Sequence, residues 1–307
     1  MTRIAVLIPC FNEAIAIGKV VRDFTAALPA ARIYVYDNNS TDNTMHVARD
    51  AGAVVRKQDL QGKGNVVRRM FADVDADVYV LVDGDATYDA GAAPAMVQKL
   101  MDDNLDMVVG VRNTDEANAY RQGHRFGNRM LTGLTGRIFG RTFTDMLSGY
   151  RVFSRRFVKS YPAHAGGFEV ETELAVHALE LRMPVAEYST RYGSRMDGSH
   201  SKLSTWRDGW RILVTILKLT KNGKPLLFFG TGAAICSLAA LLLAVPLLIT
   251  YVHTGLVPRF PTAILCSALM VLAGIFVVCG LVLDTVTLGR REHKHLAYLS
   301  YPPPRLD

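Results

Sequence analysis

Two stretches in the last third of the chain contain no charged residue, and they limit its possible folds more than any other feature. They cover residues 226–252 and 263–283. Each is long enough to cross the roughly 30 Å hydrocarbon core of a membrane, for which a helix needs about 20 residues. A short segment containing Pro258 and Pro261 joins them. We therefore expect a transmembrane hairpin over residues 225–289, with spans at about 226–252 and 262–288.

Basic residues lie at both sequence ends of this hairpin, which would be on the same side of a membrane. The flanks carry six of them, against a single arginine, Arg259, in the connecting turn: Lys218, Lys221, Lys224, Arg290, Arg291 and Lys294. The positive-inside rule then predicts an integral membrane protein whose large N-terminal domain, basic tail (290–307) and termini are all cytoplasmic. These flanks explain part of the net charge of +7, so nucleic acid is not an expected partner.

The segment before the hairpin has the pattern of a helix that lies in the membrane interface. Its apolar residues recur at spacings of three and four and include two tryptophans: Leu203, Trp206, Trp210, Leu213 and Leu217. Lysine and arginine occupy the other faces, where lipid headgroups would lie. We expect an amphipathic interfacial helix over residues 203–224.

The first half of the chain alternates strand and helix patterns. Apolar runs predict strands at 4–9, 32–37, 53–56, 78–82 and 106–111, and helical patterns fall between them at 13–28, 41–51, 64–74 and 92–101. Further along, 169–183 has helical spacing and 184–192 returns to a strand pattern. This alternation predicts an α/β fold with a mostly parallel, Rossmann-like sheet that helices cover on both faces.

Carboxylates follow the most apolar of these strands. Asp83 and Asp85 come directly after Val78–Val82, and Asp89 follows them. Ligands of open α/β sheets bind at the carboxyl ends of strands, and carboxylate oxygens suit Mg²⁺ or Mn²⁺, which also take substrate phosphates as ligands. A strand–turn–helix junction is the alternative explanation, with Asp89 as the helix cap.

Two other strands end in polar residues. The first leads into Pro9-Cys10-Phe11-Asn12-Glu13, and the second ends at Asp37, which could accept hydrogen bonds from a base or a ribose. The sequence has no Gly-x-Gly-x-x-Gly, so a dinucleotide is disfavoured. Lys63 lies in Gly-Lys-Gly, which is not a complete phosphate loop, and we expect at most a contact with a diphosphate.

In this order, these motifs resemble the family 2 glycosyltransferases of GT-A fold, from about residue 4 to residue 205. Asp83-x-Asp85 is similar to their metal-binding D-x-D motif. The segment from Asp145 through Ser148-Gly149-Tyr150 to Arg151 resembles the D-x-x-S-G-F/Y-R motif of the branch that includes the dolichyl-phosphate mannose synthases. The later Arg195 and Ser201-Lys202-Leu203 are similar to that branch's loop over the lipid phosphate.

The resemblance implies a GT-A domain at residues 1–202 that transfers a hexose, with inversion and with Mg²⁺ or Mn²⁺, from a UDP- or GDP-linked sugar to a polyprenyl phosphate. The metal ligands would be Asp83 and Asp85. The catalytic residues would be Asp83, Asp85, Asp145 and Arg151. The nucleotide sugar would bind to Pro9, Asn12, Glu13, Asp37, Lys63, Asp83 and Arg112. The acceptor phosphate would bind to Arg125, Arg129, Arg137, Ser148, Arg151, Arg195 and Lys202.

Some alternatives stay open at this stage. The acceptor could be a hydroxyl of a glycolipid or polysaccharide, in which case Asp145 or another carboxylate would act as base. A membrane scaffold with a degenerate nucleotide domain is a third reading, against which intact Asp83 and Asp85 argue. Thr87 stands where many dolichyl-phosphate mannose synthases have Gln, so the third metal ligand is open. Small residues in the hairpin would allow a homo-oligomer.

Overall fold

The computed structural model describes residues 2–113, 143–163, 166–167, 169–194 and 220–304, together with residues 133, 136, 214, 217 and 218. The chain divides into two compact units. The first comprises residues 1–212 and 293–307, and the second comprises residues 213–292.

The first unit contains a seven-stranded sheet in the order β3-β2-β1-β4-β6-β5-β7. Its strands are β1 Ile4–Cys10, β2 Arg32–Asp37, β3 Val54–Lys57, β4 Val78–Leu81, β5 Met107–Asn113, β6 Arg151–Ser154 and β7 Val185–Arg191. Strands β1 to β4 pair in parallel, as do β5 and β7, whereas β6 runs antiparallel to both of its neighbours. The predicted mostly parallel α/β sheet is therefore confirmed.

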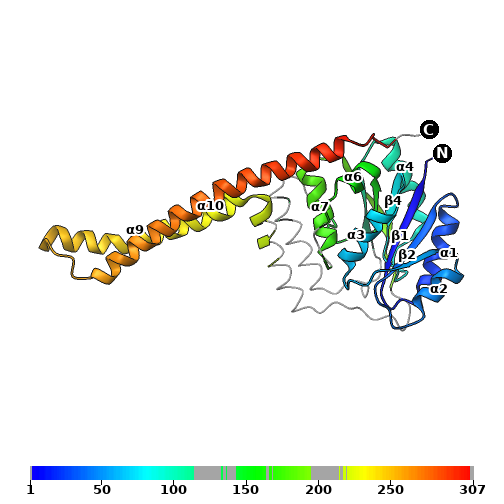
Figure 1. Ribbon diagram of the computed structural model, residues 1–307, viewed down its shortest axis with the longest axis horizontal. Coiled ribbons are helices and arrows are strands. Elements are labelled where there is room, and N and C mark those ends of the chain that lie inside the picture. The colour runs from blue at the N-terminus through cyan, green and yellow to red at the C-terminus, as the bar shows by residue number, and fades with distance from the viewer. Residues whose placement is uncertain are drawn as a thin grey trace. The chain divides into compact units, whose positions relative to one another are not determined.

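Helices cover both faces of this sheet, and Figure 1 shows α1 and α2 on one side of the strands with α3, α6 and α7 on the other. The bounds are α1 Ile17–Ala27, α2 Thr44–Asp50, α3 Lys63–Asp73, η1 Ala90–Ala92, α4 Ala93–Asp102, α6 Arg155–Ser160 and α7 Val170–Glu180. Helix α1 packs through Ile17, Val20, Val21 and Phe24, whose spacing places them on one apolar stripe.

On the opposite face, aromatic rings hold the helices to the sheet. Phe71 of α3 contacts Phe153 of β6 edge-on with ring centroids 5.8 Å apart. Phe157 of α6 stacks on Phe153 at 4.6 Å and meets the ring of His177 from α7 at 5.2 Å. Such ring pairs add about 0.5–1.5 kcal/mol each beyond the area that they bury.

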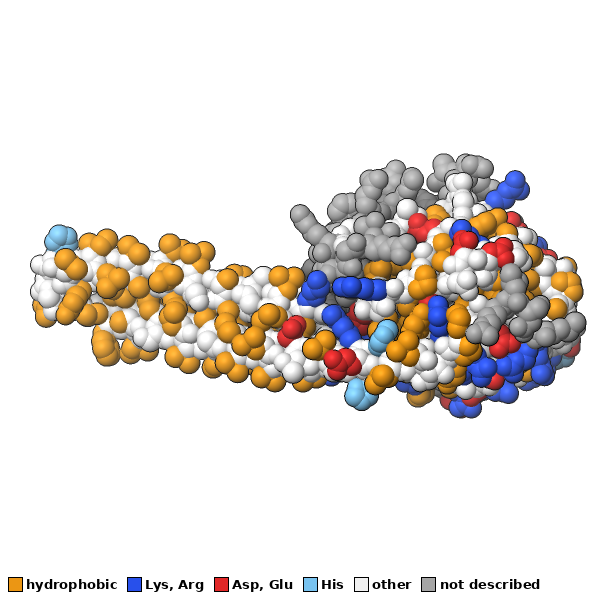
Figure 2. All heavy atoms as spheres, turned by 90° about the horizontal axis from the view of Figure 1, so that it is seen from above, with side chains coloured by type: hydrophobic (Ala, Val, Ile, Leu, Met, Phe, Trp, Pro, Cys, Tyr) orange, Lys and Arg blue, Asp and Glu red, His pale blue; other side chains and the backbone are white. Residues whose placement is uncertain are grey.

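The second unit contains α9 Pro225–Thr254 and most of α10 Phe260–Leu299, whose residues from 293 onward belong to the first unit. Each is long and apolar enough to cross a membrane, and most of its apolar side chains are exposed. Figure 2 shows hydrophobic side chains over the surface of this helix pair. The helical hairpin expected from the sequence is thus present, although α10 continues well past residue 288.

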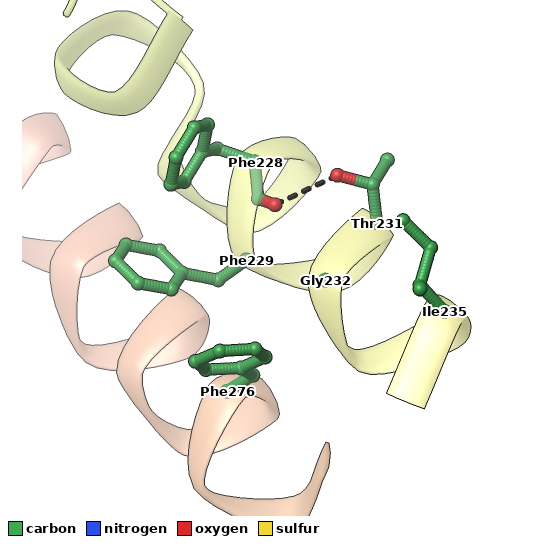
Figure 3. Close-up of a pocket in the computed structure, with 6 residues that line it drawn as sticks. All are labelled: Phe228, Phe229, Thr231, Gly232, Ile235 and Phe276. Atoms are coloured by element: carbon green, nitrogen blue, oxygen red, sulfur yellow. Dashed lines mark hydrogen bonds between the residues drawn. The ribbon is translucent and has the colours of Figure 1, made fainter. Parts of the chain in front are cut away.

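Glycines allow the two helices to pack closely. A Cβ on Gly232 would lie 3.0 Å from the ring of Phe276, and one on Gly280 would lie 3.3 Å from Phe229 Cβ. Figure 3 shows Phe229 and Phe276 beside an apolar pocket of about 300 Å³ lined by Phe228, Phe229, Thr231, Gly232, Ile235 and Phe276. The Thr231 hydroxyl donates to the Phe228 carbonyl at 2.7 Å, so the hydroxyl beside this pocket is satisfied by its own helix.

The last turns of α10 belong to the first unit and contact its sheet and helices. Lys294 pairs with Glu180 of α7 at 2.8 Å. The Tyr298 hydroxyl donates to Asp106 at 2.8 Å, and the Arg156 guanidinium lies over the Tyr298 ring at 4.7 Å. Residues 290–299, expected at the start of a basic tail, are therefore helical and partly packed.

Candidate active site

Three parallel strands end side by side at one edge of the sheet. Cys10 of β1 is paired in register with Asp37 of β2, and Leu7 of β1 is paired with Leu81 of β4. A Cβ on Gly84 would lie 2.6 Å from Cys10 Sγ, so the turn after β4 touches the end of β1. The structure thus brings the three polar strand ends together at the carboxyl edge, where α/β sheets bind ligands.

Loops after β1 and β2 interlock beside this edge. Asn12, at φ 53°, accepts a hydrogen bond from the Thr41 amide at 2.8 Å, and its own amide donates to Ser40 Oγ at 2.8 Å. The Glu13 amide donates to Thr44 Oγ1 at 2.9 Å. Asn12 and Glu13, both predicted to bind nucleotide, therefore help to shape the loops around Asp37.

One oxygen of the Asp37 carboxylate is not used by any described residue of the protein. The carboxylate is 1% exposed, and Oδ2 accepts from the Ser40 amide at 3.0 Å. Among the described residues Oδ1 has no hydrogen-bond partner. A buried acceptor without a donor is destabilising by about 1–3 kcal/mol, and an N–H or O–H of a bound nucleotide would relieve that cost.

Lys63 joins two carboxylates from distant parts of the chain. Its Nζ lies 2.5 Å from Asp83 Oδ1 and 2.5 Å from Glu171 Oε1. Burial alone would lower the pKa of Lys63, but the two negative charges outweigh burial and raise that pKa above its usual value. The lysine is therefore a fixed cation at the edge of the predicted metal site.

Asp85 and Asp89 have different surroundings. Asp85 is buried, and its Oδ1 accepts from the Thr87 hydroxyl at 2.6 Å and from the Thr87 amide at 3.3 Å, across Ala86 at φ 58°. Asp89 Oδ1 accepts from the Gly91 amide at 2.8 Å at the start of η1. The cap role considered for Asp89 is thus confirmed, and Thr87 binds Asp85 in this structure.

The motif from residue 145 to residue 151 forms a buried loop against Asp83. A Cβ on Gly149 would lie 2.8 Å from Asp83 Cγ, so only glycine fits there without a shift. The Gly149 amide donates to the Tyr88 hydroxyl at 2.9 Å, and the Ser148 hydroxyl donates to the Gly110 carbonyl at 2.5 Å.

Arg151 is fully buried, with 0% of its surface exposed. Its guanidinium donates to the carbonyls of Ser148 at 3.0 Å and Met146 at 2.5 Å, and burial lowers its pKa. In this arrangement neither Arg151 nor Ser148 presents an open face to a phosphate. Both instead hold the loop that carries Gly149, which differs from the direct contact with acceptor that the sequence motif suggested.

The Arg112 guanidinium forms a bidentate ion pair with the Asp145 carboxylate. Arg112 Nε lies 2.7 Å from Asp145 Oδ2, and Nη2 lies 2.7 Å from Oδ1. The Thr144 and Asp145 amides donate to Glu187 of β7 at 2.6 Å and 3.4 Å, and Arg112 also lies over the Tyr192 ring at 5.5 Å. Asp145 is thus fixed as one half of a bidentate pair.

Glu171 and Glu187 were not among the predicted site residues. Glu171 is a carboxylate in a helix whose other residues are largely buried, and that contrast is the available sequence signal. Glu187 has no such signal, because β7 is buried only at Val185 and Thr190. The acceptor-site candidates Arg125, Arg129, Arg137, Arg195 and Lys202 lie outside the described residues, as does most of the predicted interfacial helix.

The donor set fits a divalent cation that is completed by a ligand. Within the described part of the chain, no group of three or more His, Cys, Asp or Glu residues could hold a metal ion. Two carboxylates at one strand end, Asp83 and Asp85, are nevertheless the usual protein share of a Mg²⁺ site that also uses substrate phosphates. Asp83 is the more exposed of the two, with 30% of its side chain accessible.

Comparisons with known proteins agree on one family. The model named "Glycosyl transferase family 2" matches residues 5–161. "Glycosyltransferase AglJ" of Haloferax volcanii is 36% identical over 230 residues, which cover 74% of this chain and 75% of that protein. "Dolichyl-phosphate hexose transferase" of the same organism is 28% identical over 218 residues, covering 70% of this chain and 93% of that protein.

A solved structure shares the fold. Glucosyl-3-phosphoglycerate synthase from Mycobacterium tuberculosis, in complex with Mn²⁺, UDP-glucose and phosphoglyceric acid, matches with a TM-score of 0.58. The match covers 71% of this chain and 79% of that chain at 21% sequence identity. At that identity the likeness concerns the fold alone.

Proposed function

Since this chain belongs to glycosyl transferase family 2, we propose that it transfers a hexose from a nucleotide diphosphate sugar to a polyprenyl phosphate. The observation that carries this proposal concerns the carboxyl edge of the GT-A sheet. Asp37 ends β2 and Asp83 and Asp85 follow β4, two strands that pair with β1 on either side. Lys63 pairs with Asp83 at the same edge. Asp37 would bind the nucleoside through its unused oxygen, and Lys63 would lie beside the diphosphate.

Departure of the nucleoside diphosphate builds up negative charge on its phosphates. A divalent cation held by Asp83 and Asp85 would neutralise part of that charge. Mn²⁺ is the first ion to test, because the mycobacterial protein of the same fold was solved with Mn²⁺ and UDP-glucose. Lys63 would add a positive charge that is already in place.

The Arg112–Asp145 pair supports a phosphate acceptor. A sugar hydroxyl needs a base to take its proton, and both oxygens of Asp145, the carboxylate considered for that role, accept from Arg112. A phosphate monoester is already largely ionised near neutral pH, because its second pKa is about 6. A polyprenyl phosphate could therefore attack the sugar without a dedicated base.

The two apolar helices support a lipid substrate. A polyprenyl phosphate is anchored in the bilayer, and α9 and α10 would hold the enzyme in the same bilayer. The name of the Haloferax dolichyl-phosphate hexose transferase points to the same class of acceptor for that relative. The basic flanks favour the cytoplasmic face for the catalytic domain and both termini.

The test is transfer by membranes that contain the full chain. Labelled UDP- and GDP-hexoses would be incubated with a polyprenyl phosphate and Mn²⁺ or Mg²⁺. We expect a lipid-linked monosaccharide that mild acid releases, and we expect EDTA to abolish its formation. A labelled product that resists mild acid would indicate a hydroxyl acceptor, and failure with every nucleotide sugar would overturn the proposal.

A further inference from the structure

Lys63 pairs with Asp83, one of the two carboxylates proposed above as metal ligands. One oxygen of Asp83 lies 2.5 Å from the ammonium. Gly149 lies against the same carboxylate, since a Cβ built there would meet Asp83 Cγ at 2.8 Å. Asp83 therefore lies between a lysine and a glycine, and a cation of the protein itself offsets part of its charge.

Backbone contacts fix the position of this lysine. Gly62 at φ 124° precedes Lys63, and a Cβ on Gly62 would collide with the Gly166 carbonyl. The Gly64 amide donates to the Gly167 carbonyl at 3.1 Å. The loop before α3 is thus docked on the loop before α7, and only 12% of the Lys63 side chain is exposed.

Glu171 is the second anchor of the ammonium. It lies at 2.5 Å from Nζ, it is 8% exposed, and it comes from α7, 108 residues further along the chain. An ammonium has three N–H donors. Asp83 and Glu171 take two of them, and among the described residues nothing takes the third, which could donate to a phosphate oxygen.

We propose that Lys63 is a placeholder for the metal ion: it pairs with Asp83 while the site holds no nucleotide, and it turns to the diphosphate when the nucleotide binds. Glu171 is a positioning residue that keeps Lys63 at the site after Asp83 is released. This inference rests on the proposed use of a nucleotide diphosphate. It predicts that metal and nucleotide bind together, and that metal alone binds weakly.

The charges at the site favour joint binding of metal and nucleotide. Asp83, Lys63 and Glu171 together carry a net charge of −1, and a divalent cation added alone would face the nearby ammonium. Like charges a few ångströms apart at the edge of a protein repel each other strongly, so this repulsion weakens binding of the metal ion alone. A nucleoside diphosphate brings negative charge for both cations and removes the conflict.

The experiment is a Mn²⁺ titration of the purified full chain, followed by the electron paramagnetic resonance signal of free Mn²⁺. It needs no catalytic turnover. Wild type is expected to bind Mn²⁺ at least about tenfold more tightly with UDP or GDP than without, given the size of the repulsion. Lys63→Met should bind Mn²⁺ alone at least about tenfold more tightly than wild type, because the competing charge is gone.

Glu171→Gln should not tighten Mn²⁺ binding, since it leaves Lys63 with Asp83 as its one charged partner among the described residues. Its affinity for Mn²⁺ alone should not exceed that of wild type. Lys99→Met is the matched control, because Lys99 pairs with Asp103 on the surface of α4 and should leave Mn²⁺ binding unchanged. Lys63→Gln, which keeps hydrogen bonding to both carboxylates, replaces Lys63→Met if that variant does not fold.

Two results would overturn the inference. One is equal Mn²⁺ affinity of wild type and the folded Lys63 variant in the absence of nucleotide. The other is Mn²⁺ binding by wild type that neither UDP nor GDP strengthens. Suppose that Lys63→Met tightens Mn²⁺ binding but the wild-type protein makes no lipid-linked sugar in the transfer test. The placeholder role of Lys63 then stands, and the proposed acceptor is wrong.

Discussion

Gly149 lies directly against the carboxylate of Asp83, although the two residues come from separate segments of the chain. A Cβ built on Gly149 would lie 2.8 Å from Asp83 Cγ and 3.0 Å from Oδ1. Real Cβ atoms do not approach other heavy atoms so closely, so a side chain at residue 149 would have to move Asp83. The glycine of the Ser-Gly-Tyr-Arg segment therefore controls the position of a predicted metal ligand.

Gly149→Ala is expected to lower transfer at least about tenfold without unfolding the protein, because small misplacements of reacting groups cost this much or more. The measurement is the rate of lipid-linked sugar formation, with thermal unfolding as the check on folding. Gly193→Ala is the control, since a Cβ on Gly193 meets nothing within 4 Å. Equal activity of Gly149→Ala and wild type would contradict the proposed role of Asp83.

Asp85→Ala is expected to abolish transfer while the protein stays folded and in the membrane. The variant removes a proposed metal ligand and the acceptor of the Thr87 hydroxyl, which lies 2.6 Å away. Asp89→Ala tests the same acidic segment: it removes the cap on Gly91, which typically costs about 1 kcal/mol of stability, and it should leave transfer intact. Near-normal transfer by Asp85→Ala at saturating Mn²⁺ would refute the metal assignment.

Arg112→Lys is expected to lower transfer at least about tenfold, because lysine cannot reproduce a bidentate pair with Asp145 or the stacking on Tyr192. The measurement is kcat/KM for the nucleotide sugar. Arg191→Lys on the exposed end of β7 is the matched control and should be neutral. If Arg112→Lys retained full activity, the positive charge alone would matter and the fixed geometry would not.

The sequence was sufficient to predict the strand ends, because local signals determine them. The apolar runs before Asp37 and Asp83 mark buried strands, and parallel pairing then brings both ends to one edge. The cap at Asp89 is equally local, since its partner Gly91 is two residues away. Such features need only short-range patterns and the general geometry of α/β sheets.

The contacts that organise the site were not predictable in the same way. Glu171 meets Lys63 across 108 residues, and nothing near either residue in the sequence marks the other. Arg151 resembles a phosphate ligand because arginine is rarely buried. In the structure the carbonyls of Met146 and Ser148 satisfy it inside the protein. The antiparallel direction of β6 likewise has no local signal in the sequence.

The end of α10 offers a test of stability outside the active site. Tyr298→Phe removes the hydroxyl that donates to Asp106, a carboxylate with 0% exposure, at 2.8 Å. We expect a loss of about 1–3 kcal/mol in the free energy of unfolding, because Asp106 loses a donor inside the protein. The Phe ring should keep its contact with Arg156. Tyr301→Phe is the control, and an equal effect of the two variants would contradict the role of the Tyr298 hydroxyl.

His177 should make the stability of the first unit depend on pH. Burial, followed by the positive charge of Lys294, lowers the pKa of His177 from 6.5 to about 3. Its Nε2 lies 3.0 Å from Ser160 Oγ, and Nδ1 has no hydrogen-bond partner among the described residues. The folded protein therefore keeps this imidazole neutral at a pH where the unfolded chain would protonate it.

The direction of the effect follows from that difference. Below about pH 6.5 the unfolded chain binds a proton that the folded protein does not, so stability is lost as the pH falls from 6.5 toward 3. Each pH unit in this window costs up to about 1.4 kcal/mol, which gives about 2 kcal/mol at pH 5. His177→Gln, which does not titrate, should lose correspondingly less stability between pH 7 and pH 5. Urea unfolding of both proteins at the two pH values measures this, and equal losses would show that His177 is not the group responsible.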